Sequence, residues 1–203
     1  MCQYCAGISL DDRPSVYQWA QHLEGRPLAF LDTETSGLDA HAEVVEIALV
    51  DLNGHALFHS LVRPQQALPP QAVSIHGITR EMLDEAPTLA VLWPSLMALF
   101  AFHEIIIYNA VYDLRVLAYS AGKHGLSLPG GLRTHCLMRQ FATYAGHKRT
   151  DGTYVYQKLR AACATFGLPQ GTHRAVADAE SARLLFLALQ AEGKTRLREE
   201  VER

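Results

Sequence analysis

The chain has few cysteines, no long uninterrupted apolar run and no excess of basic charge. Four cysteines in 203 residues are too few and too scattered for the disulfide framework of a small secreted protein. The longest apolar stretch, residues 89–102, contains Pro94 and Ser95 and is shorter than the roughly 20 apolar residues that cross a bilayer. With 49% hydrophobic and 19% charged residues, a globular domain remains.

The N-terminal residues lack both the basic start and the apolar core of a secretory signal, so we expect a cytoplasmic protein. Cys2 and Cys5 form a CxxC pair, but no second pair stands at zinc-site spacing, and we interpret the pair as incidental. Eighteen Lys and Arg against 21 Asp and Glu give a net charge of −3. This balance argues against a protein that coats nucleic acid by charge alone, but it allows a local contact.

One local charge bias stands out between residues 133 and 160. Its basic members are Arg133, Arg139, Lys148, Arg149, Lys158 and Arg160. Asp151 is the only acid among them. A solvated face and a phosphate-binding rim explain this run equally well, and the sequence does not choose between them.

Strand and helix patterns alternate along most of the chain. Apolar and β-branched runs predict strands at residues 27–33, 44–52, 55–62, 104–108 and 133–138. Asn53-Gly54 predicts a hairpin between the second and third of these strands. Apolar residues at helical spacing predict the main helices at residues 14–24, 88–102, 110–123 and 174–190. This order predicts an α/β fold built in layers.

We expect three parts in the chain. Residues 1–26 form an N-terminal extension with a short helix, residues 27–191 form the main domain, and residues 192–203 form a charged C-terminal tail. The composition of the tail predicts a frayed or solvated helix.

Two acids close the first predicted strand, in FLDTETSGL. Successive side chains of a strand alternate between its faces, so Asp32 and Glu34 point the same way. Two neighbouring carboxylates repel each other unless a cation or another partner compensates, and such pairs have raised pKa values or bind metal. A solvated strand end is the alternative, and the motif alone does not decide.

Two further segments carry acids toward the same region. Asp113 lies in the first turn of the helix that follows the fourth strand, at the edge of the sheet where sites gather. Asn109 is placed to cap that helix. In HRAVADAE, His173 and Asp178 are too far apart in helical phase to share a face. We therefore place His173 on the incoming loop and Asp178 on the helix, tilted toward the sheet.

These segments together resemble a known family. DTETSG, YNAVYD and HRAVAD, in that order, resemble the three motifs of the DEDDh 3′-to-5′ exonucleases, which include the proofreading subunit of bacterial replicative DNA polymerase. SIHGIT resembles a further segment of the family. Tyr108 and Tyr112 depart from the histidine and phenylalanine common there, a change that bears on nucleotide preference rather than on metal binding.

The resemblance implies an RNase H-like three-layer fold with a central mixed sheet, and a site with two divalent cations, Mg²⁺ or Mn²⁺. The implied metal ligands are Asp32, Glu34, Asp113 and Asp178. His173 would be the general base, and imidazole suits this role because its ordinary pKa of about 6.5 is close to neutrality. The implied substrate contacts are Thr35, Gly37, Leu38, His76 and Asn109.

The leading hypothesis is a metal-dependent 3′-to-5′ exonuclease that releases nucleoside monophosphates from single-stranded 3′ ends, with DNA favoured over RNA. An RNA-trimming exoribonuclease and a catalytically silent nucleic-acid-binding module are the alternatives. An aspartyl phosphatase fits poorly, since Glu34 stands where that chemistry needs a second Asp. The partner we expect is a single-stranded 3′ end and no membrane. The short segment after the third motif does not indicate a dedicated polymerase partner.

Overall fold

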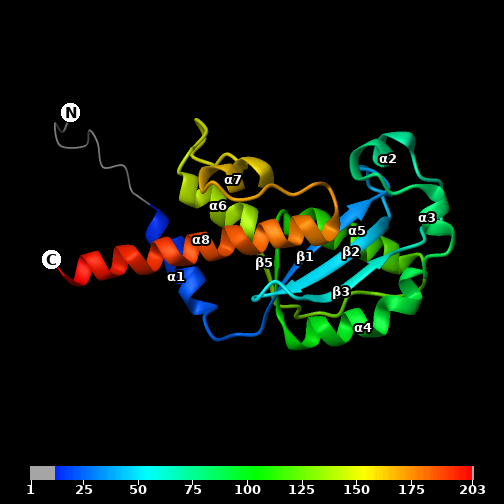
Figure 1. Cartoon of the computed structure of the whole chain (residues 1–203), viewed down its shortest axis with the longest axis horizontal. Helices are drawn as coiled ribbons and strands as arrows, with labels where there is room; N and C mark the ends of the chain where they lie inside the picture. Colours follow the sequence, from blue (N-terminus) through cyan, green and yellow to red (C-terminus); the bar gives the residue numbers. More distant parts are fainter. Residues whose placement is uncertain (1–11, 203) are drawn as a thin grey trace.

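The computed structural model describes residues 12–202, which form helices on both faces of a mixed five-stranded sheet (Figure 1). The strands lie in the order β3-β2-β1-β4-β5. Their bounds are β1 Leu28–Thr35, β2 Val44–Asp51, β3 Ala56–Leu61, β4 Glu104–Ile107 and β5 Thr134–Cys136. β2 is antiparallel to β1 and β3, whereas β4 is parallel to β1 and β5. All five predicted strands are therefore confirmed, with small shifts at their ends.

Alternation along β1 decides which helices its residues meet. Leu28 and Phe30 belong to one buried cluster, whereas Ala29 and Leu31 belong to another. Because side chains of a strand alternate between faces, the even-numbered positions share one side of the sheet. Asp32 continues this even-numbered series toward the strand's C-terminal end.

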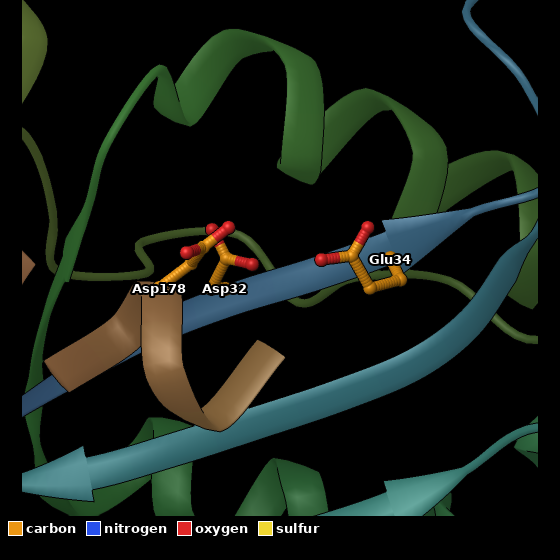
Figure 2. Close-up of side chains that lie close together, drawn as sticks. All are labelled: Asp32, Glu34 and Asp178. Carbon is orange, nitrogen blue, oxygen red and sulfur yellow. The ribbon is translucent and has the colours of Figure 1, made fainter. Parts of the chain in front are cut away.

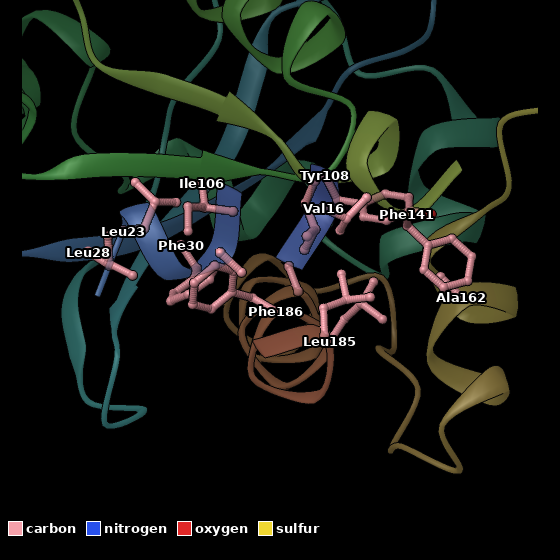
Figure 3. Packing of buried hydrophobic residues seen from close by; sticks show 14 of the residues in the cluster. Val16, Leu23, Leu28, Phe30, Ile106, Tyr108, Phe141, Ala162, Leu185 and Phe186 are labelled. Atoms are coloured by element: carbon pink, nitrogen blue, oxygen red, sulfur yellow. The ribbon is translucent and has the colours of Figure 1, made fainter. Parts of the chain in front are cut away.

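The first buried cluster lies between the sheet and four helices. These are α1 Arg13–His22, α6 Leu137–Ala145, α7 Leu159–Thr165 and α8 Ala175–Val201. Phe186 of α8 is fully buried, with its ring 5.6 Å from that of Phe30 and 5.5 Å from that of Trp19. Figure 3 shows Phe186 beside Phe30, with Phe141 of α6 and Ala162 of α7 in the same cluster.

The second buried cluster lies on the opposite face, under α4 Leu89–Phe102 and α5 Ala110–Gly122. Two short helices, α2 Pro70–His76 and α3 Arg80–Asp84, lie beyond β2 and β3 at one end of the sheet (Figure 1). The predicted three-layer arrangement is confirmed.

The last helix continues into the predicted tail. We expected a frayed or solvated helix after residue 191, and α8 continues to Val201 with Thr195, Arg198 and Glu199 exposed. Glu192 accepts hydrogen bonds from Tyr17 (3.0 Å) and Tyr144 (2.6 Å), and Lys194 forms an ion pair with Glu24 at 2.6 Å. These contacts with α1 and α6 explain why a charged segment is held in a regular helix.

Two predictions are not decided by these observations. The Cys2 and Cys5 pair lies outside the described residues. The division of the chain after residues 26 and 191 stays a prediction, although α1 and α8 share one buried cluster with the sheet.

Candidate metal site and its surroundings

Three carboxylates gather where β1 meets the start of α8. β1 presents Asp32 and Glu34, and the first turn of α8 presents Asp178. One oxygen from each lies within 4.8 Å of the others. Figure 2 shows the carboxylates of Asp32 and Asp178 beside each other, with Glu34 further along the strand. The predicted shared face of the two β1 acids is confirmed, and so is the tilt of Asp178 toward the sheet.

Burial and mutual repulsion oppose the ionisation of this group. Burial, followed by the charges of Asp113 and Asp178, raises the pKa of Asp32 well above its ordinary value. Burial and the charge of Asp178 raise the pKa of Glu34 to about 8. Burial also raises the pKa of Asp178, although the nearby His173 opposes this shift. A bound cation would favour the ionised forms, because opposite charge lowers a carboxyl pKa.

Asp113 lies next to this cluster without joining the three-oxygen group. It is 4% exposed, and its Oδ1 accepts a 2.7 Å hydrogen bond from the hydroxyl of Thr33. Burial raises the pKa of Asp113 to about 7, against the lowering effect of this bond. The resemblance implied that all four acids converge. The structure brings three together, and holds the fourth close enough for its charge to affect Asp32.

His173 occupies the loop before α8, as predicted. Its φ is +55°, an uncommon conformation for a residue with a side chain. The residue is exposed, and Arg174 follows it as the N-cap of α8. Gly171, two residues earlier, lies so close to Asp178 that a Cβ atom there would overlap the carboxylate. The loop thus brings an imidazole near the acids and uses a glycine to make room for Asp178.

The loop after β1 is fastened to α5 by hydroxyl groups. Tyr112 donates its hydroxyl to the carbonyl of Gly37 at 2.6 Å, and its oxygen lies 2.6 Å from the hydroxyl of Thr35. Thr35 also donates to the Gly37 carbonyl at 2.9 Å. Leu38 then projects into solvent, 83% exposed. The tyrosine that departs from the family pattern therefore shapes the loop proposed to contact substrate.

His76 ends α2 and has one unpaired polar atom. Its Nδ1 accepts a 3.0 Å hydrogen bond from the backbone of Ile78, so the proton of the neutral ring lies on Nε2. Nε2 is buried and makes no hydrogen bond of good geometry among the described residues, although the backbone of Thr35 is near enough to favour its protonation. Burial lowers the pKa of His76, which favours this neutral form. A buried donor without a partner is costly, and a ligand group would relieve that cost.

Asn109 differs from its predicted role. It is the N-cap residue of α5, but its side chain makes no capping hydrogen bond. Its φ of +69° is left-handed, a conformation that asparagine tolerates better than most residues. The side-chain amide of Asn109 thus makes no hydrogen bond to the end of the helix.

Sequence reasoning missed Glu46, a buried acid on β2 directly opposite Glu34. Arg174 donates two hydrogen bonds to it, at 2.7 and 3.0 Å, and the backbone N–H of Ala175 donates a third at 3.0 Å. Burial raises its pKa, but these bonds and one from His59 outweigh burial and lower the pKa to about 2. An acid at the centre of an otherwise apolar strand was the available signal.

Glu46 therefore fixes the start of α8 to the sheet. It stays ionised because Arg174 compensates its charge, and it receives the first N–H of the helix that carries Asp178. Two carboxylates that face each other across the β1–β2 pair thus have opposite pKa shifts: Glu34 is raised and Glu46 is lowered. A difference in available donors explains the contrast.

Comparison with known proteins identifies the class. The exonuclease family RNase_T matches residues 29–186, and the chain belongs to this family. The chain is 39% identical over 156 residues to an uncharacterized exonuclease (CP81) of Escherichia phage 186, across 73% of this chain and 80% of that one. It is 28% identical over 180 residues to the DNA polymerase III subunit epsilon of Escherichia coli, across 78% of this chain and 69% of the subunit.

Solved structures of exonucleases are also similar to this chain. Exonuclease X in complex with 5′ overhanging duplex DNA is 28% identical, with a TM-score of 0.59, over 81% of this chain and 92% of that one. The nuclease domain of 3′hExo, a DEDDh family member bound to rAMP, is 14% identical, with a TM-score of 0.66, over 83% and 93%. The latter shares the fold. The RNase H-like prediction is confirmed, and the protein is a DEDDh-type 3′-to-5′ exonuclease, a hydrolase that acts on nucleic acid.

The family depends on divalent metal, and the acidic cluster supplies a candidate site for it. In residues 12–202 no helix is both long and apolar enough to cross a membrane.

Glu34→Gln should stabilise the metal-free protein at pH 8. Well below pH 4.5 the carboxyl is protonated in both the folded and the unfolded chain and contributes nothing. As the pH rises toward 8, the unfolded chain ionises first, so the folded state loses stability. Removing the charge should raise the melting temperature at pH 8 by roughly 2–4 °C, which corresponds to about 1 kcal/mol. Thermal unfolding in EDTA measures this shift, and an unchanged or lower value at pH 8 contradicts the account.

Glu46→Gln should leave the fold intact but reduce activity. The substitution keeps the volume of Glu46 but removes the charge that pairs with Arg174. Because residues that orient metal ligands typically change activity by about 10–100-fold, we expect a loss in that range. Kinetics and circular dichroism should be measured together, with Glu24→Gln, in the turn after α1, as an exposed control. Activity equal to that of the control would show that Glu46 does not position α8.

Proposed function

We propose that this exonuclease removes nucleoside monophosphates from single-stranded 3′ ends, with DNA preferred, in a reaction that needs two divalent cations. The observation that carries the proposal is the cluster of Asp32, Glu34 and Asp178, whose partly buried carboxylates lie within 4.8 Å of one another. Holding these carboxylates together costs free energy unless a cation compensates their charge. The cluster lies on a chain of the exonuclease family.

The donor set fits the proposed metals. Carboxylate oxygens suit hard cations such as Mg²⁺ and Mn²⁺, and no cysteine or histidine belongs to the described cluster. Asp32, Glu34 and Asp178 would share one region, and Asp113 would close it from the α5 side. When bound, paired cations supply an activated water and stabilise the leaving 3′ oxygen.

The chain's own groups would handle the proton and the substrate. His173 would accept a proton from the attacking water, and its place on an exposed loop gives it access to solvent. Thr35, Gly37 and Leu38 would form the edge on which the terminal nucleotide rests. The unpaired Nε2 of His76 would donate a hydrogen bond to the nucleotide, and Asn109 has a free amide for the same purpose.

The relatives favour DNA and keep RNA as the alternative. The exonuclease X structure contains duplex DNA with an overhang, and the epsilon subunits belong to a DNA polymerase. The 3′hExo domain is bound to rAMP instead, but its identity of 14% shows only the fold. The epsilon relatives also make a polymerase the first protein partner to test. The cytoplasmic location stays a prediction.

A 5′-labelled single-stranded DNA oligonucleotide should be shortened stepwise from its 3′ end in the presence of Mg²⁺. EDTA and Asp32→Ala should each abolish the shortening, because the cation and one of its ligands are lost. A matched RNA oligonucleotide should be degraded more slowly. Gel electrophoresis follows the products, and Glu24→Gln is the control for an acid outside the site. Binding without turnover at every metal concentration would instead support a silent binding module.

His173→Ala should lower kcat by about 10²–10⁴-fold, the range typical of a lost general base. The stabilisation of the fold by Mg²⁺ should persist, because the imidazole is not among the proposed ligands. Kinetics and a Mg²⁺-dependent melting curve separate the two effects. Unchanged kcat would remove His173 from the mechanism, and loss of the Mg²⁺ effect would make it a metal-site residue.

A further inference from the structure

The basic residues from 133 to 160 do not form a single group in the structure. Arg133 donates its guanidinium to backbone carbonyls at residues 101 and 102, at 2.9 and 3.1 Å. Lys148 pairs with Asp12 at 2.8 Å. Arg139 and Arg149, ten residues apart, line the same open pocket. The run is thus not a single solvated face, and only part of it is arranged as a site.

We name this the α6 pocket, a depression of about 530 Å³ between α6 and the connection that follows it. Its lining residues are Arg139, Thr143, Arg149, Thr153, Tyr154 and Tyr156. The α6 residues of the pocket are one turn apart, so they share a face of the helix. Phe141, between them in sequence, is fully buried in the core (Figure 3). Core packing on one side therefore fixes the outward face of α6.

Neither arginine of the α6 pocket forms an ion pair with a carboxylate of the described residues, although hydrogen bonds from Thr153 and the charge of Arg149 lower the pKa of Asp151. The guanidinium of Arg139 has no hydrogen bond or ion pair with any described residue, and that of Arg149 donates to the carbonyl of Tyr154 at 3.0 Å. The acids nearby have other partners. Asp12 binds Lys148 and the hydroxyl of Tyr154, and Asp151 accepts from the backbone and hydroxyl of Thr153. The pocket therefore keeps positive charge in a chain whose net charge is negative.

An aromatic ring lies beside these charges. Tyr156 is 49% exposed, so its ring is accessible to a ligand. Guanidinium groups bind phosphate oxygens in a planar, forked geometry, and exposed aromatic rings stack on nucleobases of any sequence. A pocket of a few hundred Å³ suits a small planar group. The combination matches one nucleotide of a single strand better than it matches an apolar peptide.

A hydrogen bond links the wall of the α6 pocket to the end of the sheet that carries the acids. The carbonyl of Gln157, next to Tyr156, accepts a 2.8 Å hydrogen bond from the hydroxyl of Tyr108. Tyr108 directly follows β4, and α5 with Asp113 begins two residues later. One hydrogen bond thus connects the pocket wall with the segment that leads into the site.

We propose that the α6 pocket binds a nucleotide of single-stranded substrate upstream of the 3′ end, with phosphate at Arg139 and Arg149 and a base against Tyr156. This rests on the proposed function, since it assigns the pocket to the same nucleic-acid strand. It also goes beyond that function, because the contact lies outside the three motifs. Longer substrates would gain affinity from the pocket, whereas a dinucleotide held at the catalytic site would not.

The test compares Arg139→Gln and Tyr156→Ser with Arg198→Gln, an exposed arginine near the end of α8. Fluorescence anisotropy in EDTA measures binding of single-stranded DNA of about twenty nucleotides without hydrolysis. Kinetics with Mg²⁺ then compare this DNA with a dinucleotide. We expect Kd and KM for the long DNA to rise roughly threefold or more with kcat unchanged. For Arg139→Gln, the slope of log K against log salt should flatten by about 0.7.

The dinucleotide should show no change in any of these variants. Long-DNA binding equal to that of Arg198→Gln would overturn the proposal. So would an equal loss on the dinucleotide, because the residues would then act at the catalytic site. If the wild-type protein hydrolyses nothing, the proposed function fails, but the anisotropy arm still decides whether the α6 pocket binds single-stranded DNA.

Discussion

Repulsion between partly buried carboxylates is the constraint on which this structure depends. Asp32, Glu34 and Asp178 come from two elements that pack against each other, and the packing that buries the core also brings their oxygens within 4.8 Å. Each resists ionisation there, and the pKa of Glu34 rises to about 8. The core therefore holds together an arrangement that a cation would stabilise. This connects the stability of the fold, its response to pH and its chemistry.

The residues around the cluster show how the chain limits the free-energy cost of burying acids. Glu46 is as buried as Glu34 and directly opposite it, yet Arg174 and the first N–H of α8 keep its pKa near 2. Asp113 is partly satisfied by the hydroxyl of Thr33. Glu46 thus has donors strong enough to offset burial, whereas Asp113 and the acids of the cluster do not. The difference in donors separates the acids that support the site from those left to a metal.

Local patterns predicted the parts of the site that depend on local geometry. Alternation along a strand places Asp32 and Glu34 on one face, and helical phase separates His173 from Asp178. The ion pair between Glu46 and Arg174 joins residues 128 positions apart, so no local pattern predicts it. The orientation of Asp113 toward Thr33 depends on which face of β1 meets α5. The sheet and main helices followed from periodicity. The hydrogen bonds of Glu192 with Tyr17 and Tyr144, which hold α8 beyond residue 191, join distant residues and did not.

The most direct test of the account is a crystal structure of the protein with Mn²⁺, with anomalous scattering used to locate the metal. We predict a peak bounded by the carboxylates of Asp32, Glu34 and Asp178, with a second on the side of Asp113. The carboxylates should stay within a small distance of their metal-free positions, because the fold already brings them together. Manganese bound elsewhere, or no peak at these carboxylates under saturating Mn²⁺, would contradict the claim that this cluster is the metal site.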